Sequence, residues 1–429
     1  MERTYIKDLV PGSRYKIQGF VENFRNKRTM AFIVVKDITG KVQVTVEKES
    51  HPEIAAAIES LTVDSVITVE GELIASEYVK LRNMEMIPDT LVVESLAEPR
   101  PIKEDSLIDA RLDYRWIDLR SERNTLIFKM QTAMVKAMRN FLYERGFMEI
   151  HSPKLIGAAS ESGADVFEMK YFDRKAYLAQ SPQFYKQMAM AAGFDKIFEV
   201  GPVFRAEKSF TSKHTTEFTG FDLEFSYITS FRDVMKLEEE LLRYTLSEVK
   251  AAYGDEIKAL YDLDVTVPET PFPVIKLCDL YKELKERYGY EVPASEMGDL
   301  TTDAEKLSYR FVKEVYNHEF LFVTDFDAQK RAFYHMRDEN GVPMGYDLIW
   351  RGVEITTGAQ REHRYEVLRR QADEKGLGED VKNYMQFFRY GCPPHGGFGI
   401  GVDRLTMLFL GLPIKEAMFL FRGPNRLEP

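Results

Sequence analysis

The chain has 429 residues, which is too long for one average domain and suits two or three. Its apolar fraction of 44% is ordinary for a globular protein, and the absence of any run long enough to cross a bilayer excludes a helical membrane protein. The net charge of −11 argues against a protein that binds nucleic acid over its whole surface, although local basic patches remain compatible with it.

Cysteine content and the first residues bear on the cellular compartment. Cys278 and Cys392 lie far apart and form no metal-spaced cluster. Residues 1–4 lack the charged-then-apolar pattern of a secretory signal. We therefore expect a protein of the reducing cytoplasm, with no membrane partner.

The first part of the chain is rich in short segments of alternating polarity, at residues 15–21, 31–35, 42–46 and 65–69. With a helical stretch near residues 52–61, about five strands and one helix are typical of a small closed or partly open barrel. We place this domain at 1–97. Two prolines, Pro99 and Pro101, then indicate a linker, which we place at 98–125.

The rest of the chain, 126–429, mixes helices and strands. Helical periodicity runs through residues 125–146 and stops at Gly146, as at a helix C-terminus. Further on, two strands are predicted at 198–207 and 218–225, separated by a polar loop that contains Lys213 and His214. We expect a second domain in which strands and helices are combined.

Side chains alternate faces along these two strands. Phe221, Leu223 and Phe225 point into a core, and the opposite face presents an aromatic ring, a bare backbone and two acids: Phe218, Gly220, Asp222 and Glu224. Arg205 and Glu207 share one face of the preceding strand. Such a surface can hold a nucleotide and a cationic amine, and an exposed sheet face with surface ion pairs is the alternative.

A glycine-rich strand lies near the C-terminus. Gly397, Gly399 and Gly401 fall on one face, which indicates close approach of a ligand or another backbone. Arg404 then lies at the start of a helix predicted at 405–410. The partial positive charge at a helix N-terminus does not stabilise a cation, so we expect Arg404 to bind an anionic ligand. A dinucleotide fold is disfavoured because no acidic residue follows at the end of a second strand.

Two more segments carry polar residues at suggestive spacing. Ser181 is a good N-cap and Pro182 a good first residue for a helix in which Gln183 and Lys186 share a face that can hold a carboxylate. An exposed surface lysine is the commoner arrangement. Asp347 and Glu354 flank a predicted turn and can bind Mg²⁺ through oxygen, with two solvated surface acids as the alternative.

Together these segments resemble the class II aminoacyl-tRNA synthetases of subclass IIb over essentially the whole chain. Residues 146–153 resemble the family's motif 1, residues 204–218 motif 2 and residues 397–404 motif 3. The resemblance implies an α+β protein: an N-terminal OB-fold β-barrel that binds the anticodon, and a catalytic domain with an antiparallel sheet flanked by helices. It also implies a homodimer formed through motif 1.

The resemblance further implies an ATP site. Phe218 would stack on adenine with Arg404 on its other side, Arg205 would hold the α-phosphate, His214 would approach the γ-phosphate and Glu207 would contact the adenine amino group. Arg205 and Arg404 would be the catalytic charges, and Gly399 and Gly401 would line the site. Bound Mg²⁺ would be held by Asp347, Glu354 and the hydroxyl of Thr357.

Lysyl, asparaginyl and aspartyl enzymes share this architecture. Residues 180–186 are similar to the Gln-Ser-Pro-Gln-x-x-Lys signature of the aspartyl enzymes, and residues 358–363 to a run typical of their archaeal and eukaryotic type. The implied amino acid is L-aspartate. Its side chain would lie between Lys186 and Arg361, and its ammonium would contact Asp222 and Glu161, with help from Gln183. Asparagine would leave such a buried cation pair without a counter-charge.

In the barrel, the resemblance assigns anticodon binding to Phe32 and Gln43, beside the basic loop residue Arg25. Residues 26–30 depart from the usual Asp-Leu-Gly-Gly stretch of this barrel loop. In the family, a few residues of the loop decide whether tRNA-Asn is charged as well as tRNA-Asp, so the implied RNA partner is tRNA-Asp, with or without tRNA-Asn. Three alternatives remain: an asparaginyl-tRNA synthetase, an amide-forming asparagine synthetase on the same fold, and a non-catalytic tRNA-binding paralogue. Lys186 and Arg361 count against the first, the barrel against the second, and the intact motifs against the third.

Overall fold

The structure is a computed structural model that describes residues 1–157, 166–208 and 213–429. The chain divides into two compact units, Met1–Lys103 and Glu104–Pro429. The segment 98–125, expected as a linker, lies mostly in the second unit and contains two short helices and the start of a third. None of the helices in the described ranges has the length and apolar character needed to cross a lipid bilayer.

The first unit is a closed barrel with strand order β1-β2-β3-β5-β4, in which β4 also pairs with β1. Every second residue of β2 is buried, which is the period expected of a strand with one face toward a core. The barrel prediction is therefore confirmed. The elements are β1 (Ser13–Asn26), β2 (Met30–Asp37), β3 (Gly40–Glu47), α1 (Pro52–Ile58), β4 (Val66–Ala75) and β5 (Met84–Ser95).

The second unit is built around a sheet that, within the described residues, has eight strands in the order β12-β13-β14-β15-β16-β11-β10-β6. The strands from β13 to β10 are antiparallel, as expected, whereas the edge strands β12 and β6 run parallel to their neighbours. The strands are β6 (Met148–Glu149), β10 (Lys196–Phe204), β11 (Glu217–Ser226), β12 (Val274–Lys276), β13 (Phe320–Thr324), β14 (Gly345–Trp350), β15 (Val353–Arg361) and β16 (His395–Gly401). A smaller sheet joins β7 (Leu155–Ile156), β9 (Arg174–Leu178) and β8 (Glu168–Tyr171).

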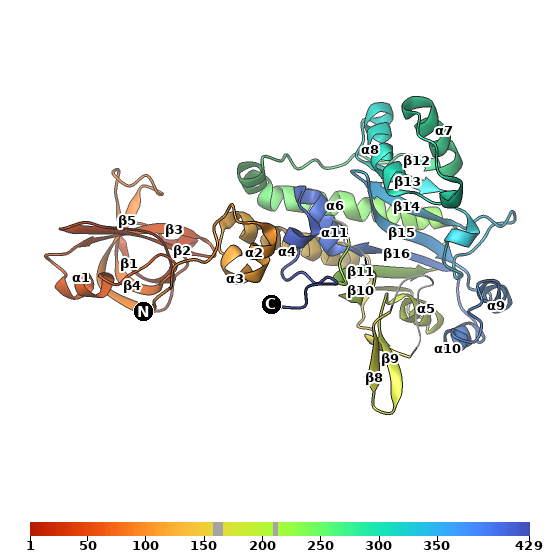
Figure 1. The fold of residues 1–429 in the computed structure, drawn as a ribbon, viewed down its shortest axis with the longest axis horizontal. Helices are drawn as coiled ribbons and strands as arrows, with labels where there is room; N and C mark the ends of the chain where they lie inside the picture. The colour runs from red at the N-terminus through yellow and green to blue at the C-terminus, as the bar shows by residue number, and fades with distance from the viewer. Residues whose placement is uncertain (158–165, 209–212) are drawn as a thin grey trace. The chain divides into compact units, whose positions relative to one another are not determined.

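Helices cover the large sheet unequally. On one face, α4, α6 and α11 bury a continuous apolar core that includes Phe221, Leu223 and Phe398 from the sheet (Figure 1). On the other face, α5 packs on β10 and β11, and α8 packs on β13, β14 and β15. The helices of this unit are α2 (Ile108–Asp113), α3 (Arg115–Asp118), α4 (Glu122–Glu144), α5 (Gln183–Ala191), α6 (Phe231–Tyr261), α7 (Leu277–Tyr288), α8 (Thr302–Tyr316), α9 (Tyr365–Glu374), α10 (Lys382–Met385), α11 (Val402–Leu410) and α12 (Ile414–Ala417).

Helix boundaries follow local capping chemistry. Ser121 caps α4 by accepting a hydrogen bond from the amide of Asn124, and the chain leaves this helix through Gly146 at a φ of +77°. Ser230 and Asp233 form a capping box at the start of α6. The prediction for α5 was one residue early, because Pro182 rather than Ser181 is its N-cap residue. The hydroxyl of Ser181 still accepts a hydrogen bond from the amide of Gln183, at 3.3 Å.

Candidate active site

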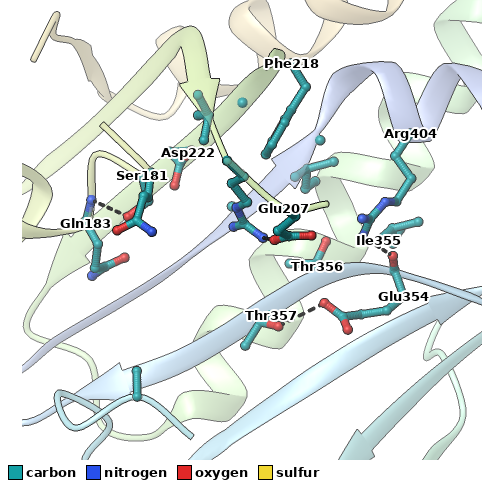
Figure 2. A pocket seen from close by; sticks show the side chains of 18 of the residues that line it. Ser181, Gln183, Glu207, Phe218, Asp222, Glu354, Ile355, Thr356, Thr357 and Arg404 are labelled. Carbon is teal, nitrogen blue, oxygen red and sulfur yellow. Dashed lines mark hydrogen bonds and ion pairs between the residues drawn. The ribbon is translucent and has the colours of Figure 1, made fainter. Parts of the chain in front are cut away.

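A pocket lies over β11, β15 and β16 on the face of the sheet opposite the α4–α6–α11 core. Figure 2 shows its two ends, with Ser181, Gln183 and Asp222 at one and Phe218, Arg404 and Glu354 at the other. The predicted residues that line it are Gln183, Arg205, Glu207, His214, Phe218, Asp222, Glu354, Thr357, Arg361, Gly399, Gly401 and Arg404. Segments far apart in the sequence thus meet at one site.

At one end an aromatic ring and a guanidinium flank a bare stretch of backbone. Gly401 pairs with Gly220 across the strands, and a Cβ added to Gly401 would lie 3.5 Å from Cβ of Arg404 and 4.0 Å from the ring of Phe218. Arg404 is fixed by donating from Nη1 to the carbonyl oxygen of Glu354 at 2.9 Å. A flat ring system therefore has a slot with an aromatic wall here, and a cation beside it.

Arg205 and Glu207 lie just beyond β10 rather than on it, because that strand ends at Phe204. The guanidinium carbon of Arg205 is 5.5 Å from the ring centre of Phe218, and Arg205 and Glu207 approach to 3.9 Å. His214 also lies 3.9 Å from Glu207. Burial, reinforced by the positive charge of Arg404, lowers the pKa of His214, so this ring is neutral at pH 7.

The two predicted metal-binding acids come together across the β14–β15 turn. Asp347 pairs with Thr357 in the strand register, and the hydroxyl of Thr357 lies 2.9 Å from Oδ1 of Asp347 and 3.2 Å from Oε1 of Glu354. No group of three or more His, Cys, Asp or Glu side chains suited to a metal occurs in the described part of the chain. Two carboxylates joined by a hydroxyl nevertheless fit Mg²⁺, which usually binds proteins through one or two carboxylates and completes its shell with water and phosphate.

Gln183, Asp222 and Arg361 line the opposite end of the pocket and belong to a buried network of charges, whose other members, Lys186 and Glu224, are not among the lining residues. Lys186 is 1% exposed, so the surface-lysine alternative is wrong. Its Nζ lies 2.9 Å from Asp222 and 3.4 Å from Glu224, and Arg361 donates from Nε to Glu224 at 3.0 Å. Gln183 accepts from Arg361 at 3.3 Å. Two cations and two acids therefore balance each other at this end.

Glu224 is the central acid of that network. It is fully buried, and although burial by itself raises the pKa of a carboxyl group, Arg361 and Lys186 hold the pKa of Glu224 below its usual value. In the free protein Lys186 and Arg361 therefore already have internal counter-charges, which the family resemblance did not indicate. The alternating pattern of β11 had placed Glu224 on the correct face, but it carried no signal that this acid pairs with Arg361.

The glycine face of β16 has a clear physical cause. A Cβ on Gly399 would come within 2.7 Å of Oδ1 of Asp222, and one on Gly397 would meet Glu224 and the backbone of Leu223. Close approach is therefore observed on the neighbouring strand β11: at Gly397 it involves the backbone, as predicted, whereas at Gly399 it involves the side chain of Asp222 rather than a ligand or a backbone. These glycines make room for the carboxylates that balance the buried cations.

Sequence analysis named Asp347 and Lys213 but did not predict the residues that form ion pairs with them. Arg331 is 11% exposed in its side chain and donates to both carboxylate oxygens of Asp347, at 2.8 and 2.6 Å. Lys213 forms a two-oxygen contact with Glu305 of α8, at 3.0 and 2.9 Å. Neither Arg331 nor Glu305 belongs to a recognisable motif. Glu161, predicted to contact the substrate ammonium, lies outside the described residues.

The barrel brings its own predicted residues together. Phe32 lies on β2, and the side chains of Arg25 and Lys27 lie over its ring, 5.4 and 5.8 Å from the ring centre. Gln43 lies on the neighbouring strand β3, opposite Val34, and donates to Thr45 at 3.1 Å. A partly buried aromatic ring with two cations beside it is a suitable platform for an unpaired base.

Comparisons with known proteins agree with this architecture. Residues 108–422 match the family "tRNA synthetases class II (D, K and N)", and residues 15–93 match "OB-fold nucleic acid binding domain". The chain is 40% identical to the aspartate–tRNA(Asp/Asn) ligase of Methanopyrus kandleri, with 100% of both chains covered, and 40% identical to the aspartate–tRNA(Asp) ligase of Pyrococcus abyssi, with 99% of this chain and 98% of the relative covered. The crystal structure of asparaginyl-tRNA synthetase from Pyrococcus horikoshii complexed with asparaginyl-adenylate superposes with a TM-score of 0.92 at 31% identity, with 100% of both chains covered.

Proposed function

Because the chain belongs to the class II tRNA synthetases (D, K and N), we propose that it is an aspartate–tRNA ligase: it activates L-aspartate with ATP and transfers the aspartyl group to the 3′-terminal adenosine of tRNA-Asp. The observation that carries the choice of aspartate is the buried ion pair between Lys186 and Asp222, 2.9 Å apart. Each member of that pair is the natural counter-charge of one group of the substrate.

Substrate binding then becomes an exchange of ionic partners. The α-ammonium of aspartate takes Asp222, with help from Gln183 and, as the family resemblance implies, from Glu161. The side-chain carboxylate takes Lys186 and Arg361. Because the bound substrate adds one positive and one negative charge at this end, the network of two cations and two acids stays balanced. Glu224 remains with Arg361 and holds its guanidinium in place.

The chemistry needs no protein nucleophile. The α-carboxylate of aspartate attacks the α-phosphorus of ATP in line and pyrophosphate leaves, so that positioning and stabilisation of the spreading phosphate charge account for catalysis. We assign the adenine ring to the slot at Phe218 and Arg404, and the phosphates to Arg205, Arg404 and His214. His214 donates a ring N–H to a phosphate oxygen. The 3′-hydroxyl of the tRNA then attacks the mixed anhydride, and AMP leaves.

Asp347, Glu354 and Thr357 would hold Mg²⁺, which when bound would neutralise charge on the phosphate oxygens. We assign the anticodon to the barrel, through Phe32, Arg25 and Gln43. We further propose a homodimer formed through residues 146–153, since β6 is the edge strand of the large sheet in the described residues and Met148 is 53% exposed on it. The free thiols of Cys278 and Cys392 suit a reducing cytoplasm.

The test is ATP–pyrophosphate exchange with aspartate and asparagine in parallel, followed by charging of tRNA-Asp and tRNA-Asn transcripts. We expect exchange with aspartate and background exchange with asparagine. The rival is an asparaginyl-tRNA synthetase, which the similarity to the P. horikoshii structure favours and Lys186 opposes. Exchange with asparagine alone would select the rival. Equal charging of both tRNAs would extend the proposal to the specificity named for the M. kandleri relative.

A further inference from the structure

Arg331 occupies the place where a cation is expected on Asp347. It follows a short turn of 3₁₀ helix at Ala328–Lys330, and its two terminal nitrogens donate to the two oxygens of the Asp347 carboxylate. The same guanidinium lies 3.3 Å from Oδ1 of Asp299. This arrangement is a two-point guanidinium–carboxylate pair, the strongest and most directional form of such a contact. It sits among the acids that the proposed function assigns to Mg²⁺.

The hydrogen bonds leave Asp347 with little capacity for a metal. A carboxylate offers about four lone-pair positions. In the described structure, Oδ1 accepts from Arg331 and Thr357, and Oδ2 accepts from Arg331, so one position remains. Mg²⁺ requires a nearly octahedral set of oxygens. The protein alone therefore offers a single position on Asp347, the carboxylate of Glu354 and a hydroxyl that both acids already share.

Arg331 is also held in place from behind. Its guanidinium carbon lies 3.5 Å from the ring centre of Phe326, which is 3% exposed. A guanidinium stacked on a buried ring and bound at both carboxylate oxygens has few other positions to adopt. A divalent ion that enters the pocket therefore meets the fixed positive charge of Arg331, which lines the pocket and is bound to Asp347.

We propose that Arg331 is a positioning residue that stands in for a metal ion on Asp347 and keeps the free enzyme from taking up Mg²⁺ until ATP supplies phosphate oxygens. This inference rests on the proposed function, which places Mg²⁺ at Asp347 and Glu354. It makes metal binding conditional on nucleotide. It also identifies Arg331, which belongs to no motif of the chain, as the residue that sets this condition.

The experiment measures Mn²⁺ binding to the full-length protein by electron paramagnetic resonance, with and without ATP. The variant is Arg331→Met, which keeps an apolar chain over Phe326 and removes the charge. We expect the wild type to bind Mn²⁺ weakly without ATP and the variant to bind it at least about tenfold more tightly, because a fixed positive charge has been removed from a site with three nearby carboxylates. Adding Asp347→Asn to Arg331→Met cancels the gain.

Two controls keep the test decisive. Arg337→Met removes another arginine–carboxylate pair, that with Glu374 at 2.7 Å, and leaves Mn²⁺ binding as in the wild type. Arg331→Lys keeps a positive charge but loses the two-point contact with Asp347, and we expect a smaller increase in Mn²⁺ affinity. This second variant keeps the inference testable if Arg331→Met is poorly folded. Wild-type affinity in both Arg331 variants, with ATP-dependent Mn²⁺ binding retained, would overturn this inference and leave the proposed function standing. If Mn²⁺ binding in the presence of ATP did not depend on Asp347, both this inference and the Mg²⁺ site of the proposed function would be overturned.

Discussion

Lys186 offers the sharpest test of why the site takes aspartate. Replacing it with methionine keeps the length and apolar stem of the side chain but removes the ammonium that lies 2.9 Å from Asp222. The pocket end then holds Arg361 against Asp222 and Glu224, a net charge of −1. The carboxylate side chain of aspartate enters a site of like charge, whereas the neutral amide of asparagine does not.

The magnitude follows from burial. Lys186 is 1% exposed, and breaking a buried ion pair by removing one partner costs about 3–5 kcal/mol. At about 1.4 kcal/mol for each tenfold change, we expect kcat/KM for aspartate to fall by about a hundredfold or more. Activation of asparagine falls less, so the ratio of the two substrates shifts toward asparagine.

The assay is ATP–pyrophosphate exchange with both amino acids, accompanied by thermal unfolding to verify that the variant is folded. Lys258→Met is the matched control, since Lys258 forms exposed pairs with Asp262 and Asp264 on the surface of the same unit. The control retains wild-type kinetics. Aspartate activation within a few-fold of wild type in a folded Lys186→Met protein would refute the assignment of Lys186 to the substrate carboxylate.

Three more predictions test other parts of the molecule. Phe218→Leu removes the aromatic wall of the slot at Gly401 and raises KM for ATP roughly tenfold in pyrophosphate exchange, and an unchanged KM would exclude stacking there. Phe32→Ala lowers kcat/KM for tRNA about tenfold in aminoacylation but leaves pyrophosphate exchange unaltered, and loss of both would mean that the barrel variant disturbs more than RNA binding. Glu238 accepts a hydrogen bond from Tyr346, and burial raises the pKa of Glu238 from 4.5 to about 7. Between these two pH values the folded state keeps a proton that the unfolded state releases, so the stability of the folded state falls as pH rises from about 4.5 to about 7. In urea unfolding, the free energy of unfolding of the wild type should fall by about 3 kcal/mol over this pH range, whereas that of Glu238→Gln should not. Parallel pH profiles of the wild type and the variant would contradict the prediction.

Much of the fold follows from local patterns. The two-residue period of β11 correctly separated Phe221 and Leu223, which enter the core, from the polar face that lines the pocket. The glycine face of β16 correctly indicated close approach. Local patterns were less accurate at the ends of elements: β10 stops before Arg205, and α5 is capped by Pro182. At element ends, one hydrogen bond decides the boundary, and strand or helix periodicity carries no information about it.

Partners in the site could not be predicted because they depend on how distant elements pack. Arg361 and Glu224 are 137 residues apart in sequence and meet only because β15, β16 and β11 are consecutive in the sheet. Arg331 reaches Asp347 from a short turn that has no periodicity of its own. A sequence motif identifies which residue types are present, whereas the charge balance of a pocket is set by the three-dimensional neighbours of each group.

That balance changes the physical basis expected for discrimination between aspartate and asparagine. In the free protein Lys186 is paired with Asp222, so this cation is not left unpaired before the substrate binds. In the proposed binding mode, the α-ammonium of either amino acid takes Asp222, and Lys186 then loses its nearest partner. Aspartate returns a carboxylate to it, and asparagine returns only an amide dipole. An uncompensated buried charge costs several kcal/mol, which is enough for roughly a hundredfold discrimination or more without an editing step. In the proposed binding mode, selectivity would therefore arise from the exchange itself, in which Asp222 takes part as well as Lys186.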